Sequence, residues 1–247
     1  PLIIKSALGG GGRGMRIVEN SENLMSSFQE SKKESRISFD SEEIYLEKFL
    51  TNPKHIEVQL IADEESNVCD IGERDCSIQR RHQKLVEETP AKILSPESRD
   101  LLLDQAVKIA EEFGYKSLGT AEFLVDEEQN HYFIELNARV QVEHPISEMV
   151  YGINMIKDQI QLARGKNLQE DRYSSRQGSA IELRINAEDP ENEFAPASGE
   201  LNLSQLPGGN GVRVDTWIKN GIEVLPHYDS LIAKLIVHGE SRDGAIS

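Results

Sequence analysis

Residues 133–145 read Phe-Ile-Glu-Leu-Asn-Ala-Arg-Val-Gln-Val-Glu-His-Pro, and residues 134–143 alternate strictly between apolar and polar side chains. The polar members are Glu135, Asn137, Arg139, Gln141 and Glu143. In an extended chain successive side chains point to opposite sides, so all five would share one face. Two carboxylates, two amides and a guanidinium can together bind a metal ion and an anion. We therefore expect a functional site here; the alternative is a half-buried strand with one solvated face.

The segment 120–136 predicts a β-hairpin in which Asp126 pairs with His131. In this register Glu122 lies opposite Glu135, with Cβ atoms about 4.5–5.5 Å apart. Two carboxylates at that distance destabilise a sheet unless a cation or a proton lies between them. Hard oxygen ligands favour Mg²⁺ or Mn²⁺. A shift of one residue would put the glutamates on opposite faces and remove this prediction.

If the alternating stretch were one straight strand, Glu135 at its metal-binding end and Glu143 at its far end could not act at the same reaction centre. Asn137 adds a third oxygen beside Glu135, whereas Glu143 would lie about 26 Å from Glu135 in a fully extended chain. We therefore expect the strand to end near Asn137 and the chain to coil, bringing Arg139 and Glu143 back over the metal. Pro145 supports an element boundary here.

The N-terminal region predicts a glycine-rich hairpin. An apolar strand carrying Lys5 leads into the run Gly9–Gly14, and the extended residues 15–18 follow. The run formally matches the dinucleotide motif GxGxxG, but that motif requires a helix directly after it. Flexible glycines between Lys5 and Arg13 instead predict backbone N–H contacts with phosphate groups.

The run 73–84 concentrates positive charge in an acidic protein. Its basic members are Arg74, Arg80, Arg81, His82 and Lys84. We expect a polar loop after a strand that forms an anion-binding rim; the alternative is a solvated basic loop.

The remaining elements follow from apolar spacing and capping signals. Three helices are expected, at residues 21–35, 96–113 and 153–164. Ser21 would cap the first helix and Ser95 the second. The second helix would end at Gly114 and carry Leu102, Ala106, Ile109 and Phe113 on one face. Further strands are expected at residues 44–50, 55–60, 68–71, 180–185, 212–217, 221–225 and 232–238, with 55–60 and 68–71 paired across a turn at 63–67.

Composition limits the class of partner. Acidic residues number 43 against 27 basic ones, giving a net charge of −16, which argues against nonspecific binding to nucleic acid or to an anionic membrane. Only two cysteines are present, which predicts a reducing compartment, the cytoplasm, or the mitochondrial matrix if the source is eukaryotic. The chain begins within an expected strand and ends at an expected helix start, which we interpret as an internal fragment of a longer chain.

Four segments in this order resemble the ATP-grasp part of biotin carboxylase. They are Ile4-Lys5 followed by Gly9–Met15, residues 73–84, residues 135–145, and Arg184-Ile-Asn-Ala-Glu-Asp189. The resemblance runs nearly end to end, and His144-Pro145 is closer to the acetyl-CoA and propionyl-CoA carboxylase type. It implies an α+β ATP-grasp fold, with a glycine-loop lid at 1–50, an antiparallel core at 51–172 and part of a β-rich C-terminal domain at 173–247.

The resemblance also implies an activity, namely ATP- and bicarbonate-dependent carboxylation of biotin through carboxyphosphate. ATP would contact Lys5, Gly9, Gly10, Gly11, Gly12, Gly14, Glu47, Lys48, Leu50, His55, Gln79 and His82. Mg²⁺ or Mn²⁺ would be held by Glu122, Glu135 and Asn137. Bicarbonate would lie among Lys84, Arg139, Gln141, Val142 and Glu143. Glu143 would be the general base, with Lys84 and Arg139 also catalytic, and Arg184 would bind biotin and steady its enolate.

The implied partners are a biotin carboxyl carrier protein or domain, a carboxyltransferase component and a second copy in a homodimer, as in fatty acid biosynthesis for the acetyl-CoA type. The family's preceding domain lies outside this sequence, which leaves open whether the isolated chain is active. Two rival interpretations remain. One is a carboxylate–amine or carbamoyl-phosphate ligase on the same fold, and the other is a module that binds nucleotide without turnover.

Overall fold

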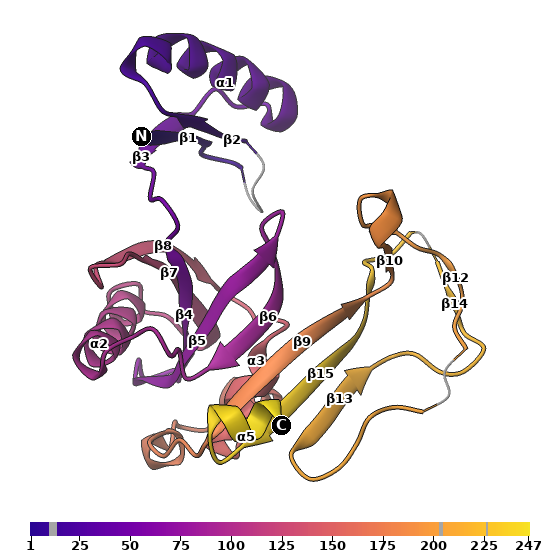
Figure 1. Ribbon diagram of the computed structural model, residues 1–247. Coiled ribbons are helices and arrows are strands. Elements are labelled where there is room, and N and C mark those ends of the chain that lie inside the picture. The colour runs from indigo at the N-terminus through magenta and orange to yellow at the C-terminus, as the bar shows by residue number, and fades with distance from the viewer. Residues whose placement is uncertain (10–13, 203–204, 226) are drawn as a thin grey trace. The chain divides into compact units, whose positions relative to one another are not determined.

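A computed structural model describes residues 1–9, 14–202, 205–225 and 227–247. The chain forms two compact units, Pro1–Pro53 and Lys54–Ser247 (Figure 1). The expected division at residue 172 stays a prediction; strands from both sides of that residue belong to one sheet. None of the described helices has the length and apolar character that crossing a membrane needs.

The first unit is a three-stranded antiparallel sheet with one long helix. Its elements are β1 (Leu2–Ser6), β2 (Met15–Val18), the 3₁₀ turn η1 (Ser21–Asn23), α1 (Leu24–Phe39) and β3 (Ile44–Lys48), in the sheet order β2-β1-β3. Lys5 lies opposite Met15, which confirms the predicted hairpin. The glycine loop at 10–13 lies outside the described residues. Ser21 is not the cap of α1, because it lies inside η1, and the helix continues past Ser35 to Phe39.

The second unit is built on one eight-stranded antiparallel sheet. In chain order its strands are β4 (Lys54–Ala62), β5 (Val68–Arg80), β6 (Gln83–Thr89), β7 (Ser117–Val125), β8 (His131–Asn137), β9 (Ser179–Asn186), β13 (Val212–Thr216) and β15 (Leu231–Gly239). Their order across the sheet is β13-β15-β9-β6-β5-β4-β7-β8. Alternation therefore predicted most of these strands correctly, including the turn between β4 and β5.

Helices cover this sheet, and two small ladders accompany it. The helical elements are α2 (Pro96–Glu112), α3 (His144–Tyr151), α4 (Met155–Ala163), η2 (Glu170–Tyr173), η3 (Pro190–Asn192) and α5 (Arg242–Ile246). The ladders pair β10 (Glu188–Asp189) with β11 (Ala195–Pro196), and β12 (Gly199–Glu200) with β14 (Glu223–Val224). The Ser95 hydroxyl accepts a hydrogen bond from the Ser98 amide at 3.1 Å, so the predicted cap of α2 is confirmed.

Alternation along β4 assigns its two faces. Ile56, Val58 and Leu60 are fully buried against α2, which contributes Leu102 and Ala106. Phe113 does not join this face. The helix ends at Glu112, so the Phe113 side chain leaves the apolar stripe and is 72% exposed.

The opposite face of β4 carries polar side chains, including Glu57 and Gln59, and α3 packs against the neighbouring strand β5. These side chains are nevertheless buried, at 0% and 1% exposure. Burying polar groups is costly unless they are paired. This face of the sheet is therefore where an ordered polar network must lie.

The predicted basic loop at 73–84 is wrong. β5 continues without a break through Arg80, and a two-residue turn at Arg81 and His82 returns the chain into β6. Both turn residues have positive φ, 52° and 65°, as a tight hairpin turn requires. The basic side chains therefore lie on strands and at a hairpin tip, and Arg74 points into the protein interior.

Candidate active site on the polar face of the sheet

Glu122 on β7 lies opposite Glu135 on β8, as predicted. The register reaches this pairing by a different route, however. At the turn end Val125, not Asp126, lies opposite His131, and a bulge at Ile134 adds one residue to β8. The bulge restores the expected pairing beyond it, so the two glutamates share a face.

The strand ends at Asn137, which confirms the limit set by chain reach. The next residues are irregular until α3 begins at His144. Arg139 turns back within this segment, and its Nη2 donates to Asn137 Oδ1 at 3.2 Å. Glu143, the residue before α3, is 2% exposed. The chain thus folds back and delivers Glu143 into the interior.

Arg74 and Glu57 form a fully buried ion pair beneath these residues. Arg74 Nε donates to Glu57 Oε1 at 2.6 Å, and both side chains have no exposed surface. The remaining guanidinium protons reach Gln59 at 2.7 Å, Ser147 at 3.0 Å and Gln141 at 3.3 Å. Removing an ion pair from water is tolerated only when its other hydrogen-bonding capacity is also used, as it is here.

Lys84 connects three carboxylates. Its Nζ donates to Glu57 Oε2 at 2.5 Å, Glu143 Oε1 at 2.6 Å and Glu122 Oε1 at 3.0 Å. Burial opposes ionisation of Glu57, but Arg74 and Lys84 outweigh it and lower the Glu57 pKa to about 2. For Lys84 burial also opposes the charge, yet the same carboxylates raise its pKa above the usual range. The Lys84 ammonium and the Glu57 carboxylate are therefore ionised together.

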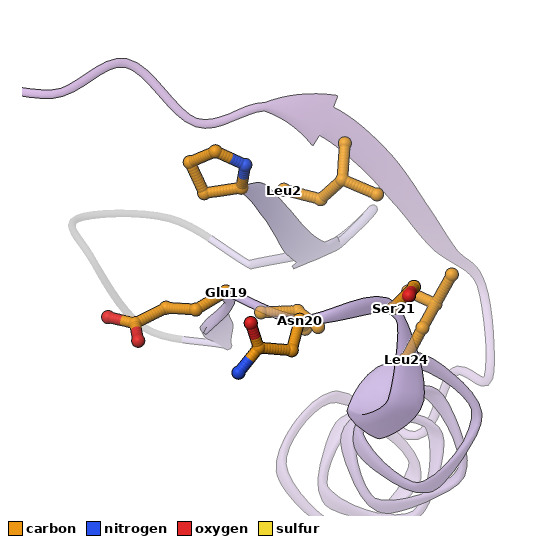
Figure 2. A pocket seen from close by; sticks show the side chains of 7 residues that line it. Leu2, Glu19, Asn20, Ser21 and Leu24 are labelled. Carbon is orange, nitrogen blue, oxygen red and sulfur yellow. The ribbon is translucent and has the colours of Figure 1, made fainter.

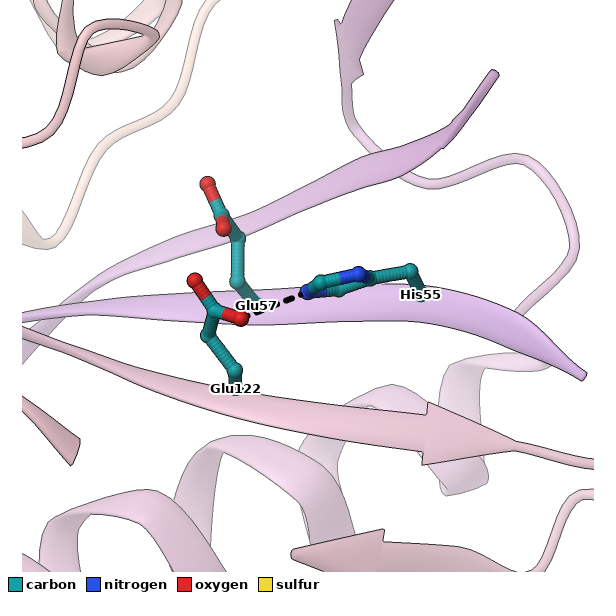
Figure 3. Close-up of side chains that lie close together, drawn as sticks. All are labelled: His55, Glu57 and Glu122. Atoms are coloured by element: carbon teal, nitrogen blue, oxygen red, sulfur yellow. Dashed lines mark ion pairs between the residues drawn. The ribbon is translucent and has the colours of Figure 1, made fainter. Parts of the chain in front are cut away.

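His55 on β4 and Glu122 on β7 lie at one edge of the group of charged side chains around Lys84. His55 Nε2 lies 2.9 Å from Glu122 Oε2 (Figure 3), and His55 Nδ1 lies 2.9 Å from Gln79 Nε2. Burial opposes ionisation of Glu122, but His55 and Lys84 overcome it and lower its pKa to about 2. Gln141 donates to the same carboxylate at 2.6 Å.

Arg184 approaches Glu143 from the other side. Its Nη2 donates to Glu143 Oε2 at 3.0 Å, while its Nε donates to Glu87 Oε1 at 2.7 Å. Lys234 on β15 donates to the Val142 carbonyl at 2.7 Å and so fixes the chain just before Glu143. Glu143 thus lies between two cations that come from different strands.

The donor set at β7 and β8 fits a hard divalent cation. Glu122 and Glu135 face each other, and Asn137 donates to Glu135 at 3.1 Å from two residues away. Among the described residues, His55, Glu57 and Glu122 also offer ligand atoms within 4.8 Å of one another. Glu57 and Glu122 of that trio already bind the Lys84 ammonium, and the set with Glu135 and Asn137 offers oxygen ligands alone, which suits a hard cation better.

The first unit carries the other predicted nucleotide contacts. Lys5 and Glu47 form an ion pair on neighbouring strands, Lys48 follows on β3, and Leu50 lies just beyond it. Gly9 and Gly14 are described, whereas Gly10, Gly11 and Gly12 lie outside the described residues.

A hollow of about 220 Å³ beside β1 and η1 is a poor phosphate site (Figure 2). Its lining side chains include Leu2, Glu19, Asn20 and Leu24, and none of the lining side chains is basic. An anion would meet the Glu19 carboxylate there with no basic side chain to compensate it.

Within the second unit the structure brings together Lys84, Gln141, Glu143 and Arg184, with Val142 held beside them. Arg139 and His82 are not part of this cluster. Arg139 is exposed beside Asn137, and His82 is exposed in the β5–β6 turn.

Sequence reasoning missed Glu57 and Lys234 and misplaced Arg74. The available signal for Glu57 was its place two residues after His55 on an alternating strand, which puts both on one face. Lys234 lies in a segment that reads as an ordinary apolar strand, and only the β9–β15 pairing opposite Arg184 shows its proximity.

Known protein families match most of the chain. Residues 1–171 match the family model of the carbamoyl-phosphate synthase L chain, ATP binding domain, and residues 182–247 match the biotin carboxylase C-terminal domain. The 2-oxoglutarate carboxylase small subunit of Hydrogenobacter thermophilus is 49% identical over 238 residues, 96% of this chain and 50% of that protein. Biotin carboxylase of Pseudomonas aeruginosa is 47% identical over 250 residues, 100% of this chain and 55% of that protein.

A solved structure of the Hydrogenobacter thermophilus 2-oxoglutarate carboxylase biotin carboxylase domain has a TM-score of 0.91 and 47% identity. It covers 100% of this chain and 55% of that one, and is a dimer in complex with MgADP, ADP and bicarbonate. The chain spans about half the length of these relatives. It belongs to the family of carbamoyl-phosphate synthase L chain ATP-binding domains, with the ATP-grasp fold, and within that family to the biotin carboxylases.

Proposed function

We propose that the full-length protein containing this chain uses ATP and bicarbonate to carboxylate biotin on a carrier protein. The observation that carries the proposal is the position of Glu143 between Lys84 and Arg184, at 2.6 and 3.0 Å. A buried carboxylate flanked by two cations from different strands combines a proton acceptor with positive charge for two anions. Bicarbonate and a biotin enolate are two such anions.

Glu143 is the proposed general base. It takes the proton of bicarbonate, so that a bicarbonate oxygen can attack the γ-phosphate of ATP. Lys84, Arg139, Gln141 and the Val142 backbone hold the bicarbonate. In this structure Lys84 and Gln141 already lie within hydrogen-bonding distance of Glu143 or Glu122. Arg139 lies farther along the chain at Asn137 and would need to turn toward the anion.

Glu122, Glu135 and Asn137 are the proposed ligands of Mg²⁺ or Mn²⁺. The metal would supply charge neutralisation at the transferring phosphate. Arg184 is the proposed biotin-binding residue, and its guanidinium would stabilise the negative charge of the enolate. Its Nε contact with Glu87 keeps the planar group in a fixed orientation.

The remaining nucleotide contacts are proposed from the family resemblance. Lys5 and the glycines between Gly9 and Gly14 would contact the phosphates. Glu47, the Lys48 backbone and Leu50 would line the adenine pocket, and His55, Gln79 and His82 would lie near the ribose and phosphates. His55 and Gln79 already contact each other on adjacent strands at 2.9 Å.

The proposed partners are a biotin carboxyl carrier protein or domain, a carboxyltransferase component and a second copy of the protein. The dimeric relative supports the last of these. The acetyl-CoA or propionyl-CoA acceptor type, with its link to fatty acid biosynthesis, rests on His144-Pro145 alone, and a cytoplasmic location rests on the two free cysteines. Similar proteins are named for 2-oxoglutarate and pyruvate.

The test is phosphate release from ATP by the full-length protein with bicarbonate, in the presence and absence of free biotin. Biotin should stimulate the release. Stimulation by ammonia or another amine in its place would favour a carbamoyl-phosphate type of ligase instead. Magnesium-dependent ATP binding without turnover under any of these conditions would favour a module that only binds nucleotide.

A further inference from the structure

Two buried carboxyl groups, those of Glu87 and Glu182, face each other next to the proposed base. Glu182 has no role in the site described above. Glu87 on β6 and Glu182 on β9 are cross-strand partners with no exposed surface. Directly opposed side chains have Cβ atoms about 4.5–5.5 Å apart. Their burial follows from α3, which packs on this face of β9 through Ile146 and Val150.

The hydrogen bonds of this pair are incomplete. Glu87 Oε1 accepts from Arg184 Nε at 2.7 Å. The described residues supply no partner for Glu87 Oε2 or for either oxygen of Glu182. A buried ionised carboxylate without hydrogen bonds is strongly disfavoured, and two of them side by side are disfavoured further. One proton between the two groups would remove one charge and give a donor to an oxygen that otherwise has none.

The surrounding charges favour one proton on the pair, held by Glu182, with Glu87 ionised. The charged groups whose fields reach the pair are Lys234 on β15, Arg184 on β9, Glu143 before α3 and Glu57 on β4. Burial raises the pKa of Glu182 to about 9, against the attraction of Lys234, and raises that of Glu87 to about 7, against the attraction of Arg184. Glu87 is the easier of the two to ionise because only Glu87 contacts a cation directly.

The ionisable groups of α3 itself are engaged elsewhere. Glu148 accepts from the Met155 amide at 2.7 Å and from Arg213 Nη1 at 2.7 Å. His144 Nδ1 lies 2.9 Å from the Gln141 carbonyl. Neither group forms a hydrogen bond or ion pair with the Glu87 or Glu182 carboxyl, so the pair depends on the strands for its charge balance.

We propose that Glu87 and Glu182 hold one proton between them and that this singly charged pair positions Arg184 against Glu143. The proposal rests on the assigned roles of Glu143 and Arg184. Glu87 anchors Arg184 Nε, which leaves Nη2 to reach Glu143 at 3.0 Å. With Glu182 neutral, Arg184 balances one carboxylate behind it and one in front. Loss of the proton would place a second negative charge behind Arg184 and draw it away from Glu143.

The first experiment compares kcat for biotin-dependent phosphate release across pH in the full-length wild type and in E182Q. Glutamine keeps the shape of the protonated acid but cannot ionise. The wild type should lose turnover as pH rises through the range of the Glu182 carboxyl, and E182Q should lack that loss. The ratio of E182Q to wild-type kcat should therefore rise by about tenfold from pH 8 to pH 10. A ratio that stays flat, or a loss of turnover in E182Q at every pH, overturns the proposal.

The matched control is E88Q. Glu88 is the neighbour of Glu87 on β6 and therefore points to the other face, where it accepts from Arg242 at 2.6 Å. Its substitution should leave the ratio to wild type constant with pH. If E88Q shows the same rise, the alkaline effect is not specific to the carboxyl pair, and the proposal fails.

A second readout does not depend on the enzyme's activity. A raised folded-state pKa means that stability is fully present below the unfolded value of about 4.5 and is lost as pH rises toward 9. The melting temperature of E182Q should therefore exceed that of wild type in mildly alkaline buffer, and the difference should shrink toward pH 5. An unchanged difference across pH would contradict the shared proton even if biotin carboxylation is confirmed. Absence of biotin-dependent turnover in the wild type would instead count against the proposed function.

Discussion

Lys84 Nζ lies 2.6 Å from Glu143 Oε1, so the proposed anion-binding cation and the proposed base are already in contact. Bicarbonate must therefore bind beside an existing ion pair. Because Arg184 holds the second oxygen of Glu143 at 3.0 Å, the carboxylate has little freedom to move.

Glu143→Gln should abolish turnover without weakening ATP binding. The amide keeps the shape but has one acceptor oxygen in place of the two that Lys84 and Arg184 hold, and it cannot take a proton. We expect kcat to fall by about 10²–10⁴-fold, the usual contribution of a general base. Phosphate release measures the first quantity, and calorimetric titration with ATP and Mg²⁺ measures the second. Loss of ATP affinity would mean that Glu143 is a binding group and not the base.

Glu57→Leu should destabilise the protein strongly. It leaves Arg74 and Lys84 without their shared carboxylate, and Arg74 has no exposed surface through which water can compensate. Breaking a buried pair in this way costs about 3–5 kcal/mol in the free energy of unfolding. Urea denaturation provides the measurement. Asp104→Asn, which removes an exposed partner of Lys108, serves as the control and should leave the denaturation midpoint unchanged. Equal behaviour of the two variants would contradict this account of the core.

Asp63→Ala should cost stability in a pH-dependent way. The carboxylate accepts from the amides of Glu65, Asn67 and Leu168 at 3.0–3.1 Å. Burial opposes ionisation of Asp63, but its hydrogen bonds, led by the Asn67 side chain, outweigh it and lower its pKa. The carboxylate's contribution is therefore present above the unfolded value of 3.8 and is lost as pH falls through the folded pKa.

At neutral pH the Asp63 substitution should lower the free energy of unfolding by about 1–3 kcal/mol, the cost of lost buried hydrogen bonds. The difference in the free energy of unfolding between the variant and the wild type should narrow as pH falls below about 4. Urea denaturation of both proteins at a series of pH values checks this, and a gap that stays constant into acid would rule out the charged form as the cause.

Glu135→Gln should weaken the response to magnesium and spare the fold. Glu135 is exposed and accepts a hydrogen bond from the Asn137 side-chain amide at 3.1 Å, so little packing is lost. The Mg²⁺ concentration for half-maximal phosphate release should rise by at least about tenfold. Glu128→Gln, in the exposed turn between the same two strands, provides the control and should show no rise. An unchanged magnesium requirement in Glu135→Gln would remove Glu135 from the metal site.

Local signals predicted much of the fold. The Ser95 cap, the β4–β5 turn and the end of β8 near Asn137 all follow from nearest-neighbour chemistry or chain reach. The pairing of Glu122 with Glu135 was also predicted, although the assumed turn register was wrong and the bulge at Ile134 corrected it. The adjacent apolar residues Phe133 and Ile134 break the alternation at this bulge and were its local signal.

The centre of the site was harder to predict because it depends on tertiary burial. Arg74 lies in a run of charges that resembles a solvated loop, and only the pairing of β5 with β4 places it against Glu57. Glu87 and Glu182 are 95 positions apart in the sequence, and their facing carboxyls follow from β6 and β9 being neighbours in the sheet. Charged residues are so seldom fully buried that sequence patterns favour the exposed interpretation.

The most direct test of the proposed chemistry uses bicarbonate labelled with ¹⁸O in the full-length protein. If a bicarbonate oxygen attacks the γ-phosphate after Glu143 takes its proton, that oxygen stays on phosphorus when carboxyphosphate breaks down. Mass spectrometry of the released phosphate should then find one labelled oxygen per turnover in the presence of biotin. Phosphate that carries no label would show that water, not bicarbonate, attacks ATP, and would contradict the assignment of this site as a biotin carboxylase centre.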